Sequence, residues 1–158
     1  MLLKVEGQSQ QLAEKIGDFI WSMKPQKDEF MTLSSRIKTY TNEILGATAI
    51  NHQLKIDSNI DHAIVDFSLR KNLLLIVKEA LNNAAKYSKA SNVFVEMKIE
   101  NNQITLQISD DGVGLPEQNK QGNGLKNMRT RTEEMKGIFA IETGFKKGVK
   151  ISVVIPCP

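Results

Sequence analysis

One long helical run constrains what this chain can fold into. From residue 69 to residue 88, apolar side chains recur every three or four positions, which predicts an amphipathic helix with Ser68 as its N-cap. Positions i, i+4 and i+7 share one helix face, because each residue turns the chain by about 100°. The apolar face consists of Leu74, Val77, Leu81 and Ala84. The opposite face carries Glu79, Asn83 and Lys86.

The polar face of this helix has two interpretations. An amide oxygen can ligate a hard cation, a lysine can neutralise phosphate, and a carboxylate can take a proton or hold a water. The three residues therefore suit a magnesium-phosphate ligand. A solvated helix face of mixed polarity has the same composition, so this pattern alone leaves both interpretations open.

The other elements follow from periodicity and turn residues. We expect helices over residues 9–24, 28–47 and 124–136, and strands over 50–57, 92–100, 103–109, 138–143 and 148–155. Asp28 is a candidate N-cap for the second helix, and Asn101-Asn102 predicts a hairpin turn. Residues 58–67 fit no single pattern.

The helix over residues 9–24 carries an apolar stripe that Pro25 ends. Its members are Leu12, Ile16, Phe19, Ile20 and Met23. The stripe can pack on the domain that follows, or it can belong to the end of a helical bundle. We favour the bundle, because a terminal helix with this many large apolar residues needs a partner. Weak self-association through residues 9–24 is therefore expected.

A carboxylate stands at the end of the strand over residues 103–109. Its inward positions are Ile104, Leu106 and Ile108, so Asp110 is the next inward residue. A buried carboxylate without partners is costly. Asp110 therefore either accepts hydrogen bonds from the following turn or waits for a donor on a ligand. Asp111 has the outward parity and is expected to be a turn residue.

Two glycine pairs follow Asp110 within a polar segment. Gly112 and Gly114 would let a ligand approach the backbone. Gly122 and Gly124 directly precede a helix, whose N-terminus offers free amide groups and the positive end of a dipole to phosphate. Taken singly, each pair is also compatible with an ordinary turn.

Several other classes of protein are disfavoured. The net charge of +3 comes from scattered Lys and Arg, which argues against direct nucleic-acid binding. The single cysteine, Cys157, excludes a disulfide framework, and no apolar run approaches the roughly 18 residues of a membrane helix. His52 and His62 lack metal-ligand spacing, and Asn127 stands where a Rossmann motif from Gly122 requires glycine. We expect a cytoplasmic module, which can still be part of a longer, membrane-anchored protein.

The order of these parts resembles the catalytic ATP-binding domain of bacterial sensor histidine kinases, in the GHKL superfamily with its Bergerat fold. The run from Glu79 to Lys86 resembles the N box, 110–114 the first glycine box, 122–129 the second, and 148–156 the closing strand. The resemblance covers residues 50–156 and is greatest to the branch whose response regulators carry LuxR-type DNA-binding domains.

This resemblance implies an α+β fold. It is a two-layer α/β sandwich, in which a mixed, mostly antiparallel sheet is covered on one face by helices and preceded by an N-terminal amphipathic helix. Residues 1–25 would be the C-terminal remnant of a dimerisation helix with its linker, and residues 26–158 the catalytic domain.

The resemblance also implies roles for individual residues. On the adenine side, Asp110 would accept a hydrogen bond from the amino group, with Gly112 and Gly114 letting the base in. On the phosphate side, Asn83 would ligate Mg²⁺, and the phosphate contacts would come from Lys86, Gly122, Asn123, Gly124 and Arg129, with Leu125 in the same motif. Glu79 would be the general base toward an incoming histidine, and Gly122 and Gly124 would hinge a lid over residues 113–123.

Two departures from the family pattern stand out. Tyr87 occupies a position where many members have His, and no histidine precedes His52, so the phosphoacceptor is missing. We therefore expect a piece of a longer kinase or a chain without its acceptor domain. It would bind Mg-ATP and phosphorylate a histidine on a separate dimerisation domain, with a response regulator downstream. The alternatives are another GHKL ATPase, such as an anti-sigma-factor serine kinase, and an interaction module without nucleotide.

Overall fold

The computed structural model describes residues 2–23, 32–119, 122–144 and 147–158. Its helices are α1 (Leu2–Met23), α2 (Leu33–Gly46), α3 (Ile60–Ala63), α4 (Phe67–Asn83) and α5 (Asn123–Glu134). A π-helical turn, η2 (Ala84–Ser88), follows α4, and a 3-10 turn, η3 (Glu117–Asn119), precedes α5. The strands are β1 (Asn51–Ile56), β2 (Asn92–Glu100), β3 (Gln103–Asp110), β4 (Ile138–Thr143) and β5 (Val149–Pro156).

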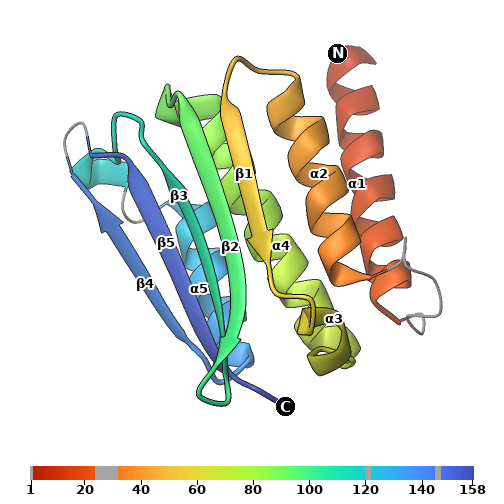
Figure 1. The fold of residues 1–158 in the computed structure, drawn as a ribbon. Helices are drawn as coiled ribbons and strands as arrows, with labels where there is room; N and C mark the ends of the chain where they lie inside the picture. The colour runs from red at the N-terminus through yellow and green to blue at the C-terminus, as the bar shows by residue number, and fades with distance from the viewer. Residues whose placement is uncertain (1, 24–31, 120–121, 145–146) are drawn as a thin grey trace.

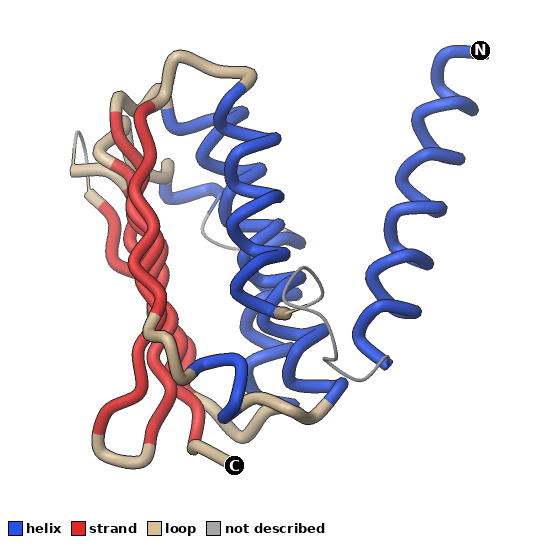
Figure 2. Tube along the Cα trace, turned by 45° about the vertical axis from the view of Figure 1, so that its right-hand side comes forward, coloured by secondary structure: helices blue, strands red, loops and turns tan. Residues whose placement is uncertain are grey.

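The strands form one mixed sheet. Its five strands lie in the order β1-β2-β3-β5-β4, with β1 parallel to β2 and every other pair antiparallel. Figures 1 and 2 show α2, α4 and α5 together on one face of this sheet, so that helices and strands form two layers. This arrangement confirms the α+β sandwich predicted from the sequence.

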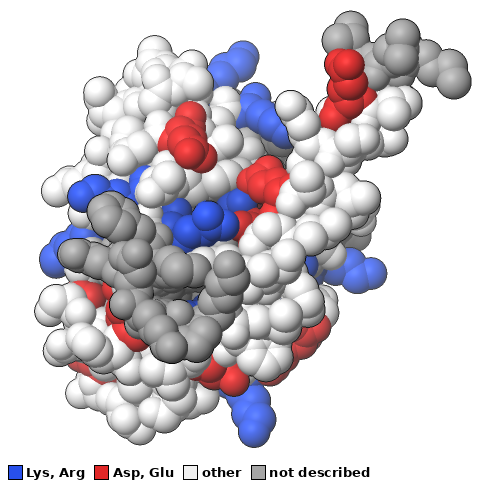
Figure 3. Space-filling view, turned by 90° about the vertical axis from the view of Figure 1, so that its right-hand side faces the viewer, with Lys and Arg blue, Asp and Glu red and all other residues white. Residues whose placement is uncertain are grey.

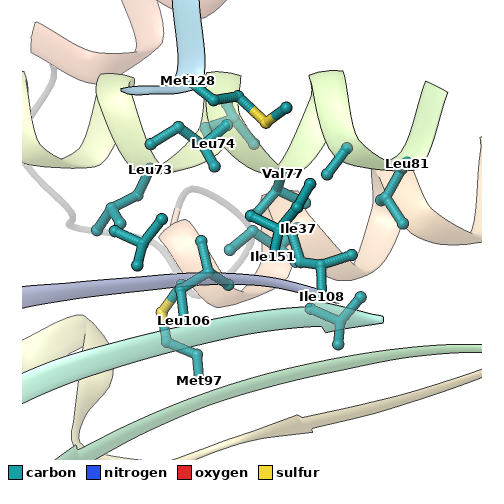
Figure 4. Close-up of a cluster of buried hydrophobic side chains, with 14 of the residues drawn as sticks. Ile37, Leu73, Leu74, Val77, Leu81, Met97, Leu106, Ile108, Met128 and Ile151 are labelled. Atoms are coloured by element: carbon teal, nitrogen blue, oxygen red, sulfur yellow. The ribbon is translucent and has the colours of Figure 1, made fainter. Parts of the chain in front are cut away.

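The apolar face of α4 packs on the sheet and builds the centre of the core. Its side chains point toward those of β2, β3 and β5, and each of the labelled residues of these elements is at most 4% exposed (Figure 4). They are Leu73, Leu74, Val77 and Leu81 on α4, and Met97, Leu106, Ile108 and Ile151 on the strands. Burial of such a side chain contributes about 1.5–3 kcal/mol. This packing fixes the rotation of α4 and turns its polar face away from the sheet.

Both long helices of the domain begin at residues other than those predicted. Asp66, not Ser68, caps α4, because its Oδ1 accepts the backbone N–H of Leu69 at 2.9 Å. Thr32 caps α2 by accepting the N–H of Ser35 at 3.2 Å, while the predicted cap, Asp28, lies outside the described residues. Residues 58–67, for which the sequence pattern predicted no element, contain α3.

Helix α1 lies beside α2 and α4 and is held there mainly by polar contacts. Asp18 is buried, and its two carboxylate oxygens accept from Arg36 Nη2 and Lys78 Nζ, each at 2.6 Å. Lys78 also pairs with Glu14 at 2.5 Å. Figure 3, which views the molecule from the α1 side, shows acidic and basic side chains meeting in the middle of this face.

Trp21 completes the attachment of α1. Its ring is 6% exposed, and the guanidinium groups of Arg36 and Arg70 lie 5.2 and 5.3 Å from its centroid. Arg70 also donates to the backbone carbonyl of Ser22. It thereby satisfies one of the carbonyl groups that the end of a helix leaves free.

The predicted apolar stripe of α1 faces outward. Its residues are all at least 45% exposed, namely Leu12, Ile16, Phe19, Ile20 and Met23. The stripe is therefore not buried on the domain that follows, and its place in a helical bundle stays a prediction. Within the described ranges, no helix combines the length and apolar character of a membrane span.

The polar attachment of α1 can be tested with the single tryptophan. Asp18→Asn removes the charge that joins Arg36 to Lys78, and the loss of one partner of a buried ion pair is strongly destabilising. We expect the fluorescence emission of Trp21 to shift to longer wavelength at temperatures well below global unfolding. Glu6→Gln, which removes an exposed charge from the same helix, is the control. An unchanged emission maximum in Asp18→Asn would show that this ion pair does not hold α1.

Candidate functional site

A cavity of about 310 Å³ opens between α4, η2, the end of β3, the start of β5 and the start of α5. Its polar side chains are Glu79, Asn83, Tyr87, Ser88, Ser109, Asp110 and Asn119. Its apolar side chains are Ala80, Ala84, Ile108, Leu115, Leu125, Val149 and Ile151, and glycines 114, 122 and 124 complete the lining. Apolar walls with a few convergent polar groups are typical of a small-molecule site.

Asp110 lies at the end of β3, on the cavity wall. Its Oδ1 accepts the backbone N–H of Gly112 at 2.9 Å. Burial raises the pKa of the Asp110 carboxyl, and the N–H groups of Gly112 and Val149 offset part of this rise. Both alternatives foreseen for this residue thus have support: the following turn occupies one oxygen, and the carboxylate still faces a cavity.

Asp111 has the turn role predicted for it. It is exposed, and its Oδ1 accepts the backbone N–H groups of Ser91 and Asn92, both at 2.8 Å. Its Oδ2 accepts from the side-chain amide of Asn92 at 2.7 Å, which is the main reason that the pKa of Asp111 is lowered. These bonds tie the end of β3 to the start of β2.

The glycines of the first pair have different surroundings. Gly114 lines the cavity and has a φ of +81°, a conformation that favours glycine. Gly112 does not line the cavity; a Cβ there would come within 2.7 Å of the carbonyl carbon of Ser88. Gly112 is therefore needed for backbone packing, since Val113 N–H also donates to Ser88 O at 2.8 Å.

The π-helical turn changes which residues face the cavity. The predicted helix over residues 69–88 ends its α-helical part at Asn83 and continues as η2. A wider turn shifts the residues that follow to new faces. In this structure Lys86 is exposed and does not line the cavity, whereas Tyr87 and Ser88 do. The predicted contact of Lys86 with phosphate therefore stays a prediction.

The start of α5 contributes only part of the predicted phosphate set. Gly122, Gly124 and Leu125 line the cavity. Asn123 is exposed and outside the lining, and the guanidinium of Arg129 lies 5.0 Å from the ring centroid of Phe139 in β4. Arg129 therefore stacks on the sheet side of α5. Of the predicted lid, Lys120 and Gln121 lie outside the described residues.

Sequence reasoning missed the residues that shape the apolar wall and support the loop. Ile108 and Ile151 are register partners in β3 and β5, and only strand pairing brings them together below the cavity. Thr143 accepts the N–H of Leu115 at 2.8 Å and donates to Gly148 O at 3.0 Å. The inward parity of Ile108 was a usable signal, whereas nothing in the sequence around Thr143 indicated its role.

The site suits a metal only together with a ligand. Among the described residues, no group of three His, Cys, Asp or Glu side chains could hold a metal ion. Asn83 offers one amide oxygen at the cavity wall. Mg²⁺ commonly binds through few protein oxygens together with substrate phosphates, so this donor set is compatible with a phosphate-borne Mg²⁺.

Comparisons with known proteins point to one family. A family model described as "Histidine kinase-, DNA gyrase B-, and HSP90-like ATPase" matches residues 69–158. The chain is 30% identical to the sensor histidine kinase LiaS of Bacillus subtilis over 122 residues, which are 76% of this chain and 34% of LiaS. It is 32% identical to the signal transduction histidine-protein kinase/phosphatase UhpB of Salmonella typhimurium over 136 residues, 85% of this chain and 26% of UhpB. The chain thus spans only about a quarter to a third of the length of these curated relatives.

Two solved structures share the fold. The histidine kinase domain of the blue-light activated histidine kinase EL346 from Erythrobacter litoralis superposes with a TM-score of 0.69 at 22% identity, covering 82% of this chain and 63% of that one. The histidine kinase AdeS of Acinetobacter baumannii gives a TM-score of 0.68 at 16% identity, covering 99% of this chain and 81% of that one. At these identities the likeness shows the fold alone, which is that of the GHKL domains.

The raised pKa of Asp110 predicts that this carboxylate does not stabilise the fold. A raised carboxyl pKa contributes stability only at low pH, and this contribution is lost as pH rises through the folded-state pKa. In Asp110→Asn the amide oxygen can still accept from Gly112. We expect the melting temperature at pH 7.5 to be unchanged or up to about 4 °C higher, with a difference from wild type that shrinks toward pH 4. If the melting temperature of Asp110→Asn at pH 7.5 fell by several degrees, the Asp110 carboxylate would instead stabilise the following turn.

Proposed function

The chain belongs to the family of histidine kinase-, DNA gyrase B- and HSP90-like ATPases, and we propose that it binds Mg-ATP and transfers the γ-phosphate to a histidine on a dimerisation domain of a sensor kinase. One observation carries this proposal. A single cavity brings together Glu79 and Asn83 of α4, Asp110 of β3, and the glycine-containing start of α5. Phosphoryl transfer requires mainly positioning and charge neutralisation, which such a set of groups can supply.

The adenine would lie against the apolar wall with its amino group toward Asp110. Ile108, Leu125 and Ile151 present apolar surface to a planar base. The Asp110 carboxylate retains acceptor capacity beyond its bond to Gly112. An exocyclic amine is a donor and would therefore be selected over a carbonyl group at this position.

The phosphates would lie near the start of α5. This helix begins after Gly122 and has no side-chain cap, so its first amide groups are available to an anion. Asn83 would hold the Mg²⁺ that screens the phosphate charge. Lys86, Asn123 and Arg129 lie outside the lining of the cavity, and their contacts with phosphate are part of the proposal.

Glu79 would act as the general base. Its carboxylate lines the cavity beside the start of α5, where the γ-phosphate is expected. It would take a proton from the incoming imidazole while the ring nitrogen forms the P–N bond and ADP leaves. General bases of this kind typically contribute about 10²- to 10⁴-fold to a rate.

The remaining assignments are part of the same proposal. LiaS and UhpB are named as sensor or signal transduction histidine kinases, which supports a catalytic role for the domain. In the proposal, residues 26–158 form this catalytic domain and residues 1–25 the end of a dimerisation helix with its linker. The exposed stripe of α1 would then join a second copy in a helical bundle. A response regulator with a LuxR-type DNA-binding domain would receive the phosphoryl group, and the domain would work in the cytoplasm beneath a membrane-anchored sensor.

The relatives disfavour the other functions considered from the sequence. Both are named as histidine kinases, and neither name refers to an anti-sigma-factor serine kinase. An interaction module without nucleotide would not need a carboxylate whose pKa is raised by burial at the wall of a cavity. A ligand of the native state raises its stability. Mg-ATP should therefore raise the melting temperature of a nucleotide-binding domain and leave that of an interaction module without nucleotide unchanged.

Asp110→Asn should weaken ATP binding by about 10- to 100-fold, because a charge-assisted hydrogen bond to the base is lost. The thermal shift caused by a fixed concentration of Mg-ATP should shrink accordingly. Asp111→Asn is the matched control, since this neighbouring carboxylate is exposed and points to the β2 side. Equal ATP-induced shifts in wild type and Asp110→Asn would refute the adenine contact.

Glu79→Gln should spare ATP binding and slow phosphoryl transfer by about 100-fold or more. The measurement is acid-labile phosphohistidine formed on a separately prepared helical domain that carries the acceptor histidine of a related sensor kinase. Glu133→Gln, an exposed substitution on α5, is the control. If Glu79→Gln transfers at the wild-type rate, another group takes the proton.

A further inference from the structure

Neither backbone conformation nor helix stability explains the glycine at position 124. Among the glycines of the described residues, positive φ angles occur at Gly114 and Gly148, and Gly124 is not one of them. Gly124 lies in the first turn of α5. Alanine could adopt this backbone and would stabilise a helix relative to glycine. The reason for a glycine must therefore lie in its surroundings.

The space beside Gly124 is occupied by the side chain of Glu79. A Cβ at position 124 would lie 3.0 Å from Glu79 Cδ, 3.4 Å from its Cγ and closer still to Oε1. Gly112 and Gly148 differ, because a Cβ there would lie 2.7 Å from a backbone carbonyl carbon, of Ser88 and Asp110 respectively. Gly124 thus leaves room for a carboxylate at the wall of the cavity that both residues line.

Helices α4 and α5 cannot easily separate to admit a methyl group. Leu125 and Met128 anchor α5 in the core, at 9% and 0% exposure. Farther along α5, Arg131 Nη1 donates to Asn72 Oδ1 at 3.2 Å, and Asn72 Nδ2 donates to Glu134 Oε2 at 3.3 Å. With the helices tied at both places, the movable partner is the Glu79 side chain. An alanine at 124 would therefore displace the carboxylate by about 1 Å and leave the fold intact.

We propose that Gly124 is a positioning residue for Glu79. Its missing side chain allows the carboxylate to lie against the first turn of α5, so the place of the base is set by α5 as well as by α4. The inference rests on the proposed function, because it takes Glu79 as the base. It adds to that function a reason for the glycine that is independent of any backbone contact with phosphate.

The test combines Gly124→Ala with Glu79→Asp, which shortens the acid by one methylene group and makes room for the added methyl. Gly124→Ala alone should slow transfer to the acceptor domain by about 10- to 100-fold. Glu79→Asp should slow transfer in the wild-type background, yet raise it in the Gly124→Ala background. If Glu79→Asp lowers the rate by the same factor in both backgrounds, Gly124 does not position Glu79. Loss of ATP affinity in Gly124→Ala without rescue would likewise overturn the proposal and favour a phosphate contact.

A second measurement needs neither nucleotide nor acceptor. Once Glu79→Ala has emptied the space, adding Gly124→Ala should raise the melting temperature by about 2 °C or more, because alanine then stabilises the helix without a clash. In the wild-type background the same change should give no such gain. Gly46→Ala, where nothing lies within 4 Å, should have the same effect in both backgrounds.

The two measurements separate the inference from the proposed function. If the wild type showed neither phosphoryl transfer nor an ATP-induced thermal shift, the proposed function would be refuted. Glu79 would then not be a general base for Gly124 to position. If Gly124→Ala changed the melting temperature equally with and without the Glu79 side chain, Gly124 and Glu79 would not be in contact, even if transfer is normal.

Discussion

The structure depends on how one amphipathic helix packs against a mixed sheet. Residues such as Leu74 and Val77 bury the apolar face of α4 against β2, β3 and β5, and this fixes the rotation of the helix. Glu79 and Asn83 must then face the edge of the layer, where β3 ends. A site is thus assembled from residues far apart in sequence by a contact that is itself purely apolar.

The site holds a carboxylate in surroundings that oppose its charge. Burial raises the pKa of Asp110, and the two backbone N–H groups only partly compensate. Sites of ligand recognition often carry groups that the fold alone would not favour. The attachment of α1 has a different character: Asp18 bridges Arg36 and Lys78, and the apolar stripe is left exposed. The polar contacts of α1 face the domain, whereas its apolar stripe faces outward.

Periodicity sufficed for the long helices, the strands and the inward position of Asp110, because period-2 and period-3.6 patterns report directly on burial. The two-layer fold was implied by the resemblance to a known family. The sequence could not reveal the π-helical turn, because the helical propensities of its five residues do not distinguish an α-helix from a π-helix. Within this turn, Tyr87 lines the cavity and Lys86 does not. Strand register placed Ile151 beside Ile108, and helix packing placed Gly124 beside Glu79. Both are tertiary relations that no local pattern encodes.

In the proposed function, this cavity recognises an adenine nucleotide through Asp110. Calorimetric titration with Mg-ATP and Mg-GTP tests it most directly, because the two bases present opposite groups to the carboxylate: an amine donor in adenine and a carbonyl acceptor in guanine. We expect saturable binding of one Mg-ATP per chain and Mg-GTP binding weaker by about tenfold or more. Equal affinities for the two nucleotides, or no binding of Mg-ATP, would show that Asp110 does not select adenine in this cavity.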